Sequence, residues 1–188
     1  MIDTTIGGIA LRFETVEGLF SPWAVDAGTL AMLSLATLSP DDKVLDLGCG
    51  YGVIGAYAAS LVDPANVWLL DNDPVAVACA DRNLTLNDVD GARVVLSDGF
   101  RGFAETGFTK ILCNPPYHAD FSVPKHMIEK GFNRMTIGGA FWLVTKRDAW
   151  YRNKLRSVFG GVRVHQQDGY FVFEAVKTSS TYARGARH

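Results

Sequence analysis

The tetrapeptide Asn114-Pro115-Pro116-Tyr117 has the residue types best suited to chemistry in this sequence. Two successive prolines remove two backbone donors and fix the chain, so hydrogen-bond acceptors dominate the turn. The side-chain oxygen of Asn114 and the carbonyl of Pro115 can together hold both hydrogens of a planar amino group. The ring of Tyr117 offers a flat face for stacking a base, a contact worth about 1 to 3 kcal/mol. We therefore predict that Asn114, Pro115 and Tyr117 form a reaction centre for an amine on an sp2 carbon.

Such an amine is a weak nucleophile because its lone pair is delocalised into the adjoining ring or carbonyl. When both hydrogens of the amino group are held, the direction of its lone pair is fixed. The reaction then depends on the alignment of the amine and on electrostatics more than on a strong base. No catalytic histidine is required, and we expect Pro116, Tyr117 and His118 to contact the substrate. The structural alternatives are a rigid loop with a packed tyrosine, and a loop histidine at 118 with ordinary hydrogen bonds.

A second candidate site is the glycine-rich segment that runs from Asp46 to Gly55 and contains Gly50-x-Gly52-x-x-Gly55. Glycines allow a tight turn and a close approach of backbone to ligand, and the helix that follows presents unpaired amide groups at its N-terminus. The same spacing occurs in dinucleotide-binding proteins, and a glycine-rich turn can also be purely structural. We therefore expect either a bound cofactor or a structural turn at this segment.

Aspartates stand at the ends of three apolar runs. Asp71 is placed where a carboxylate in doubly wound folds reaches ribose hydroxyls, and Asp98, followed by Gly99, could accept a hydrogen bond from an exocyclic amine. Asp46 would be costly to bury unless it meets a cation or several donors. The alternative for each aspartate is a helix cap or a turn former.

The elements around these motifs alternate between strands and helices. Apolar runs too short for helices, interpreted as buried parallel strands, occupy residues 44–47, 67–70, 94–96, 111–113 and 141–144. Helices are predicted at residues 23–36, 52–62, 74–87 and 124–136, and right-handed crossovers would place them on both faces of the sheet. Asp73 should cap the third of these helices, with Pro74 in its first position. The runs 162–165 and 170–173 flank Asp168-Gly169, which favours a hairpin and an antiparallel last strand.

The length of 188 residues and the 48% apolar content indicate one domain, which we place at residues 1–178. Residues 1–40 should form an N-terminal strand and helix that cover the cofactor cleft, and residues 179–188 a loose tail. No apolar run is long enough to span a membrane and no leader is evident, so we expect a cytoplasmic protein that does not bind membranes. The three cysteines lack metal-ligand spacing, so we expect buried thiols and no metal site.

The segment Asp46-Leu47-Gly48-Cys49-Gly50-Tyr51-Gly52, followed by Asp71 and Asp98, resembles the first motifs of class I S-adenosylmethionine-dependent methyltransferases. The resemblance covers nearly the whole chain and implies a Rossmann-like α/β fold with a seven-stranded, mostly parallel sheet and an antiparallel last strand. It implies that Gly48 and Gly50 approach the methionine moiety, Asp71 the ribose, and Asn72 and Asp98 the adenine. The complete predicted cofactor set is Asp46, Gly48, Gly50, Asp71, Asn72, Asp98, Gly99 and Asn114.

The Asn114-Pro115-Pro116-Tyr117 turn resembles the signature of methyltransferases that act on guanine N2, adenine N6 or a glutamine amide. Together with Gly18-Leu19-Phe20-Ser21 and Asp26-Ala27-Gly28-Thr29, it is most similar to the ribosomal RNA guanine-N2 enzymes of the "methyltransferase small" group. The best-known bacterial members carry an additional N-terminal domain that this chain lacks, which leaves RNA recognition unexplained.

The distribution of charge also favours RNA as the partner. Residues 1–120 hold 6 Lys and Arg against 16 Asp and Glu, whereas residues 121–188 hold 12 against 4. If the basic residues share a face near the cleft, they form a phosphate-attracting rim; a solvated basic face is the plain alternative. The rim would consist of Lys125, Lys130, Arg134, Lys146, Arg147, Arg152, Lys154 and Arg156.

Other functions remain open at this stage. A protein glutamine methyltransferase would need a peptide groove without a basic rim, and a DNA adenine methyltransferase usually needs a recognition domain. A nicotinamide-dependent oxidoreductase would use the same glycine loop. A non-catalytic module would keep the cofactor loop and bind RNA or a protein partner.

Overall fold

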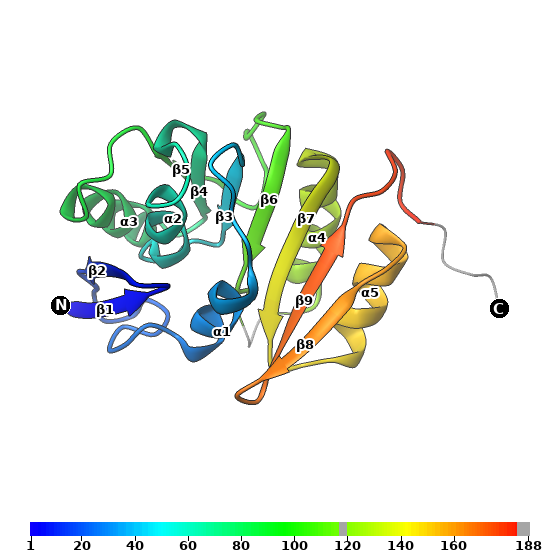
Figure 1. The fold of residues 1–188 in the computed structure, drawn as a ribbon, viewed down its shortest axis with the longest axis horizontal. Helices are drawn as coiled ribbons and strands as arrows, with labels where there is room; N and C mark the ends of the chain where they lie inside the picture. The colour runs from blue at the N-terminus through cyan, green and yellow to red at the C-terminus, as the bar shows by residue number, and fades with distance from the viewer. Residues whose placement is uncertain (117–119, 184–188) are drawn as a thin grey trace.

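The computed structural model describes residues 1–116 and 120–183. Within these residues, seven strands form one sheet in the order β5-β4-β3-β6-β7-β9-β8. The strands are β3 (Val44–Leu47), β4 (Val67–Asp71), β5 (Arg93–Leu96), β6 (Phe108–Cys113), β7 (Met135–Thr145), β8 (Arg163–Gln167) and β9 (Tyr170–Val176). Strands β3 to β7 pair in parallel, and β9 runs antiparallel to both of its neighbours (Figure 1). The predicted sheet with its reversed last strand is confirmed.

The reversal of the last strand has a local cause in the sequence. Gln167 pairs with Tyr170, so β8 and β9 are joined by the two residues between them. Those residues, Asp168 and Gly169, have φ values of 51° and 80°. Two positive φ values in a two-residue loop are the backbone requirement of the tightest hairpins, and Asp-Gly meets it with little strain.

Helices cover both faces of the sheet because its central strands are apolar on both faces. The helices are α1 (Ala27–Leu35), α2 (Val53–Ala59), α3 (Pro74–Leu86), α4 (Ser122–Arg134) and α5 (Ala149–Phe159), with the short 3-10 helix η1 (Pro64–Asn66) before β4. Successive residues of β6 pack in different hydrophobic cores. Leu112 packs in the core formed with α1, α2 and α3, and Ile111 packs in the core formed with α4 and α5. This alternation fixes the register of the strands that carry the site.

The predicted helices are confirmed, with shifted ends. Asp73 caps α3 by accepting a hydrogen bond from the Val75 amide at 2.8 Å, and Pro74 is the first helical residue. The first helix begins at Ala27, later than the predicted start at residue 23, because Asp26 takes the N-cap position. Helix α5 was not predicted, although buried residues spaced three and four apart and Gly160 at its end are the ordinary signals of a helix.

The N-terminal segment forms a hairpin and not the single strand predicted. Strands β1 (Ile2–Ile6) and β2 (Ile9–Phe13) pair antiparallel through Gly7 and Gly8, which both have positive φ. The segment then crosses to α1, which lies beside the carboxyl ends of β6 and β7 (Figure 1).

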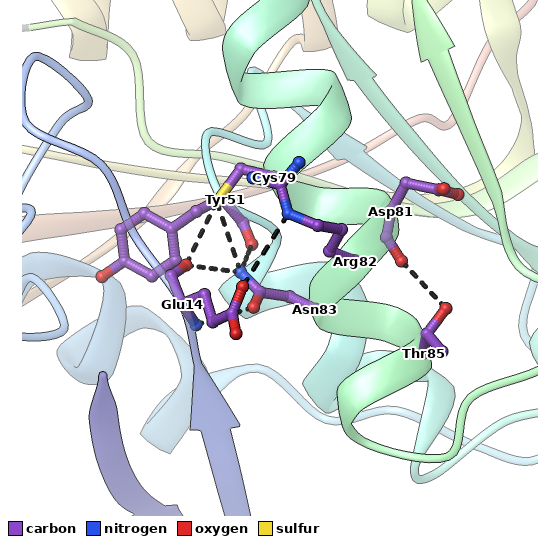
Figure 2. Close-up of polar contacts among 7 residues, drawn as sticks. All are labelled: Glu14, Tyr51, Cys79, Asp81, Arg82, Asn83 and Thr85. Carbon is purple, nitrogen blue, oxygen red and sulfur yellow. Dashed lines mark hydrogen bonds and ion pairs between the residues drawn. The ribbon is translucent and has the colours of Figure 1, made fainter.

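Asn83 fastens this N-terminal segment to the rest of the protein. Its side chain accepts a hydrogen bond from the Glu14 amide at 2.7 Å and donates to the carbonyls of Glu14 and Tyr51, both at 2.8 Å (Figure 2). Four residues later, at the C-cap of α3, Asn87 pairs in the same way with the Arg12 backbone, at 2.9 and 2.7 Å. The two asparagines thus extend the edge of β2 with side-chain amides and connect it to the glycine loop at Tyr51.

Candidate active site

A cleft of about 960 Å³ opens where the central strands end. Its walls come from the turns after β3, β4, β5 and β6, from the segment before α1, and from one side of α4. The predicted site residues on these walls are Gly48, Gly50, Asp71, Asn72, Asp98, Gly99, Asn114 and Pro116. Asp46 and Pro115 are buried and do not line the cleft, and Tyr117 and His118 lie outside the described residues.

The glycine loop is held in place by the neighbouring strand. The amides of Gly48 and Cys49 both donate to the Leu70 carbonyl, at 2.8 and 2.9 Å. A Cβ at Gly50 would meet no atom within 4 Å, whereas a Cβ at Gly55 would lie 2.3 Å from the Leu69 side chain. Gly50 therefore leaves open space beside the turn, and Gly55 permits close packing of α2 on the sheet, as in dinucleotide-binding loops.

Asp71 joins the first two turns of the sheet. Its two carboxylate oxygens accept hydrogen bonds from the Gly50 amide at 2.8 Å and the Asp73 amide at 3.0 Å. A carboxylate has about four acceptor positions, so these two bonds leave capacity for hydroxyl donors from a ligand. The geometry fixes the carboxylate on the cleft wall and keeps it able to bind a diol.

Asp46 lies behind the glycine loop. One carboxylate oxygen accepts a hydrogen bond from the Gly55 amide at 2.8 Å, and the other has no hydrogen-bond partner among the described residues. Burial raises the pKa of Asp46 to about 8, and the nearby Asp71 charge adds to this effect, although the Gly55 bond opposes it. Direct contact of Asp46 with a cofactor stays a prediction.

Asn114 is oriented by two residues at the start of α1. Its amide nitrogen donates to the Asp26 carboxylate and to the Thr29 hydroxyl, both at 2.9 Å. A carboxylate only accepts hydrogen bonds, so the nitrogen of Asn114 must face Asp26 and the oxygen must face away. That oxygen is buried and has no hydrogen-bond partner among the described residues. The arrangement presents a preoriented acceptor at the cleft.

The segment before α1 is held firmly around these contacts. The Thr15 hydroxyl donates to the Pro22 carbonyl at 2.6 Å, and the Ser21 hydroxyl donates to the Ala24 carbonyl at 2.7 Å. The Tyr51 hydroxyl lies 3.3 Å from the Ser21 carbonyl. Burial, with a smaller contribution from Asp26, raises the pKa of Tyr51 to about 12, so Tyr51 remains a donor at neutral pH. The glycine loop and the Asn114 support are therefore connected.

Helix α4 forms the wall opposite the glycine loop. Its contributions to the cleft are Ser122, Val123, His126, Met127, Lys130 and Arg134. Of these, Lys130 and Arg134 were predicted as members of the basic rim, and the other four were not predicted. The helix lies close: a Cβ at Gly99 would be 2.7 Å from the His126 ring, and a Cβ at Gly48 would be 3.2 Å from the Met127 methyl. Sequence reasoning also missed Asp26 and Thr29 as supports, because only the fold brings them to Asn114.

The described residues hold no group of three or more His, Cys, Asp or Glu that could bind a metal ion. In the same part of the chain, no helix has the length and apolar character needed to cross a membrane. The three cysteines are buried, unpaired thiols.

Comparison with known proteins places this site in a family. The model of the "Methyltransferase small domain" family matches residues 10–174. Ribosomal RNA large subunit methyltransferase G of Yersinia enterocolitica is 29% identical over 192 residues, covering 98% of this chain and 48% of the relative. The protein of the same name from Alteromonas mediterranea is 32% identical over 176 residues, covering 88% and 43%.

A solved structure shows the same architecture. The 16S rRNA N2 G1207 methyltransferase (RsmC) of T. thermophilus, in complex with AdoMet and guanosine, superimposes with a TM-score of 0.86 at 26% identity. The match covers 93% of this chain and 49% of that one, so the chain spans about half the length of the relatives it matches. Because the family model matches most of its length, the chain belongs to the methyltransferase small domain family.

Proposed function

We propose that this protein is an S-adenosylmethionine-dependent methyltransferase that modifies the exocyclic amino group of guanine, N2, in ribosomal RNA. The observation that carries the proposal is the Asn114 side chain, whose nitrogen is held by Asp26 and Thr29 and whose oxygen is buried without a partner among the described residues. A buried acceptor that lacks a donor costs free energy unless a ligand supplies one, so its presence points to an amine substrate.

The cleft fits a nucleoside cofactor that also carries an amino acid. Its volume of about 960 Å³ lies in the range of small-molecule sites. Asp71 retains acceptor capacity for a ribose diol, Gly48 and Gly50 give close backbone approach, and Asn72, Asp98 and Gly99 line the part of the cleft that would receive the adenine. S-adenosylmethionine supplies a methyl group that is already activated by the positive sulfonium.

The protein's own contribution is to hold and aim the acceptor nitrogen. The Asn114 oxygen would accept one amine hydrogen, which turns the nitrogen lone pair toward the cofactor cleft. The Pro115 carbonyl as acceptor of the second hydrogen stays a prediction, because Pro115 is buried and does not line the cleft. Tyr117 would stack on the base, and Pro116 and His118 would complete its surroundings. Alignment of this kind needs no additional general base for the attacking step, because the methyl donor would carry the activation, and the methylated nitrogen would then release its extra proton to water.

The relatives support guanine in ribosomal RNA over the other amines. The two curated relatives are named as ribosomal RNA methyltransferases, and the T. thermophilus enzyme modifies guanine N2 and holds guanosine in its structure. Glutamine amide and adenine N6 present the same two hydrogens to Asn114 and are the competing acceptors. A ribosomal RNA substrate also places the enzyme in the cytoplasm.

A methyl-transfer assay with radiolabelled S-adenosylmethionine tests the proposal. The acceptors are ribosomal subunits, naked ribosomal RNA, DNA and an undermethylated protein extract, with Asn114→Ala as the matched variant. We expect label in ribosomal RNA, and about a 100-fold lower rate for Asn114→Ala, which should still bind the cofactor as measured by calorimetry. Label confined to protein or DNA, or binding of NAD in place of S-adenosylmethionine, would reject it.

A further inference from the structure

Trp23 has a large apolar side chain that is exposed to solvent, on a segment whose backbone is held by hydrogen bonds. It is 84% exposed, whereas Trp68 and Trp142 are buried. The segment around it is fastened by the Thr15–Pro22 and Ser21–Ala24 hydrogen bonds described above. A tryptophan that is both exposed and held in a fixed backbone leaves more than 150 Å² of its surface available for contact.

This segment is part of the reaction centre. Phe20 and Ser21 line the cleft, and Asp26, three residues after Trp23, orients Asn114. A base that stacks on Trp23 would therefore lie on the same RNA strand as the target base whose amine reaches Asn114. Aromatic platforms of this kind bind unpaired bases with little dependence on sequence, because every base has a flat face.

Four of the eight residues of the predicted basic rim differ in whether a carboxylate neutralises them. Arg152 forms an ion pair with Asp148 at 2.8 Å, and Lys154 forms one with Glu129. Lys146 and Arg147 are exposed and form no ion pair among the described residues; Lys146 lies 5.0 Å from the Tyr170 ring centre. Carboxylates already neutralise the first group, so the second is the better attractor of phosphate.

The unpaired cations stand beside the reaction centre. Lys146 and Arg147 directly follow β7, at the same sheet edge as the turn that carries Asn114. The Tyr170 ring beneath Lys146 packs against Gly28 in α1, where a Cβ would come within 2.6 Å of it. Arg147 lies 5.3 Å from the ring centre of Phe121, which itself stacks on Trp150 with the two ring centres 4.5 Å apart. Aromatic contacts thus hold both cations in place.

We propose that Trp23 stacks on an unpaired base next to the target base and that Lys146 and Arg147 bind phosphates of the same RNA strand. The inference rests on the proposed function, since it names the surface by which an RNA substrate is held. The exposed ring and the two unneutralised cations at one sheet edge favour a single-stranded nucleic acid as the partner, because its bases can stack on the ring and its phosphates complement the positive charges.

Tryptophan fluorescence with a short guanine-containing oligoribonucleotide tests the platform without requiring catalysis. In the free protein, acrylamide should quench the fluorescence of the exposed Trp23, and bound RNA should quench the same fluorescence. Trp23→Phe should lose this quenching by RNA, while its affinity for RNA should stay within about threefold of the wild type. Trp23→Ala should bind about 5- to 150-fold more weakly. Ile137→Ala, which removes an exposed side chain near the start of β7, is the control and should bind normally.

The salt dependence of binding tests the cations. Lys146→Ala/Arg147→Ala should lower the slope of log affinity against log salt by about 1.4, as expected for two lost contacts to a single strand. Arg152→Ala/Lys154→Ala removes the same net charge from a neutralised position and should leave the slope nearly unchanged. Equal slopes in the two double variants would overturn this part of the proposal.

The outcomes separate this surface from the proposed function. If the wild-type protein methylates RNA while Trp23→Ala binds and reacts normally, the surface is wrong and the function stands. If it binds RNA through these residues but transfers no methyl group, the function is wrong and the surface stands. Normal oligonucleotide binding by Trp23→Ala, with a defect only on assembled ribosomal subunits, would show that Trp23 contacts protein and would overturn the proposal.

Discussion

The Asp26 carboxylate accepts a hydrogen bond from the Asn114 side-chain nitrogen at 2.9 Å, across 88 positions of sequence. The same Asp26 oxygen also accepts from the Thr29 amide at 2.9 Å and so caps α1. One side chain therefore sets the start of a helix and the orientation of the proposed reaction centre. The helix position and the direction of the Asn114 oxygen are coupled by this arrangement.

Removing the Asp26 carboxylate should impair methyl transfer without impairing cofactor binding. In Asp26→Ala, the Asn114 amide can rotate, and we expect kcat to fall about 100-fold because the acceptor is misplaced. Asp26→Asn keeps an oxygen that can accept from Asn114 and should recover part of the loss. Single-turnover rates combined with calorimetry of S-adenosylmethionine make the test; a parallel loss of cofactor affinity would mean that Asp26 acts only through folding.

Replacing Asp46 should change how stability depends on pH. An acid with a pKa of about 8 in the folded protein and 3.8 as its ordinary value binds its proton more tightly when folded. The free energy of unfolding therefore falls as pH rises between these two values. Asp46→Asn keeps an acceptor for the Gly55 amide and removes the titration, so its urea midpoint should decrease less from pH 5 to pH 8 than that of the wild type. Parallel pH profiles would contradict the assignment.

Asn83 should contribute more to stability than Asn87, although the two make similar pairings with β2. Asn83 is fully buried, and Asn83→Ala removes its bonds to three backbone groups of Glu14 and Tyr51, of which the bond to the Tyr51 carbonyl is itself buried. We expect a loss of about 3 kcal/mol in the free energy of unfolding, measured by urea denaturation. Asn87→Ala is the matched control and should lose about 1 kcal/mol or less, because water can replace its exposed contacts.

Lys177 should act as a structural cap at the end of α4. Its ammonium is buried, donates to the carbonyls of Phe132 and Met135 at 2.9 and 2.8 Å, and lies 4.5 Å from the Phe132 ring centre. Lys177→Met preserves the apolar stem but leaves both carbonyls without this donor, and should lower the free energy of unfolding by about 2 kcal/mol. A thermal or urea midpoint equal to that of the wild type would show that water replaces the ammonium.

Much of the fold could be predicted because its signals are local. Strands β3, β4 and β6 each contain a short, mostly apolar run that ends in a turn, and Asp168-Gly169 sets the final hairpin by its backbone preference alone. Strand β7 begins at Met135, inside the predicted helix 124–136, because pairing with neighbouring strands overrides the local helical pattern. The N-terminal hairpin was missed although Gly7-Gly8 is itself a turn signal.

The supports of the site could not be predicted, because they depend on long-range contacts. Nothing near Asn83 in the sequence shows that it binds Glu14 and Tyr51, and the link from Asp26 to Asn114 exists only once α1 meets the end of β6. The pairing of the cations in the predicted basic rim was only partly predictable. Glu129 neutralises Lys154 only because α4 packs on α5, whereas Asp148 and Arg152 are four residues apart and form a local pair once α5 is a helix.

The most direct test of the central claim is mass analysis of nucleosides from ribosomal RNA that the purified protein has methylated. The wild-type protein should produce N2-methylguanosine. Asn114→Ala should produce it about 100-fold more slowly while still binding S-adenosylmethionine, because the acceptor that orients the amine is lost and most of the predicted cofactor contacts are kept. A different methylated nucleoside, or a wild-type rate of N2-methylguanosine formation by Asn114→Ala, would contradict the role of the Asn114 oxygen as the acceptor that selects the amine.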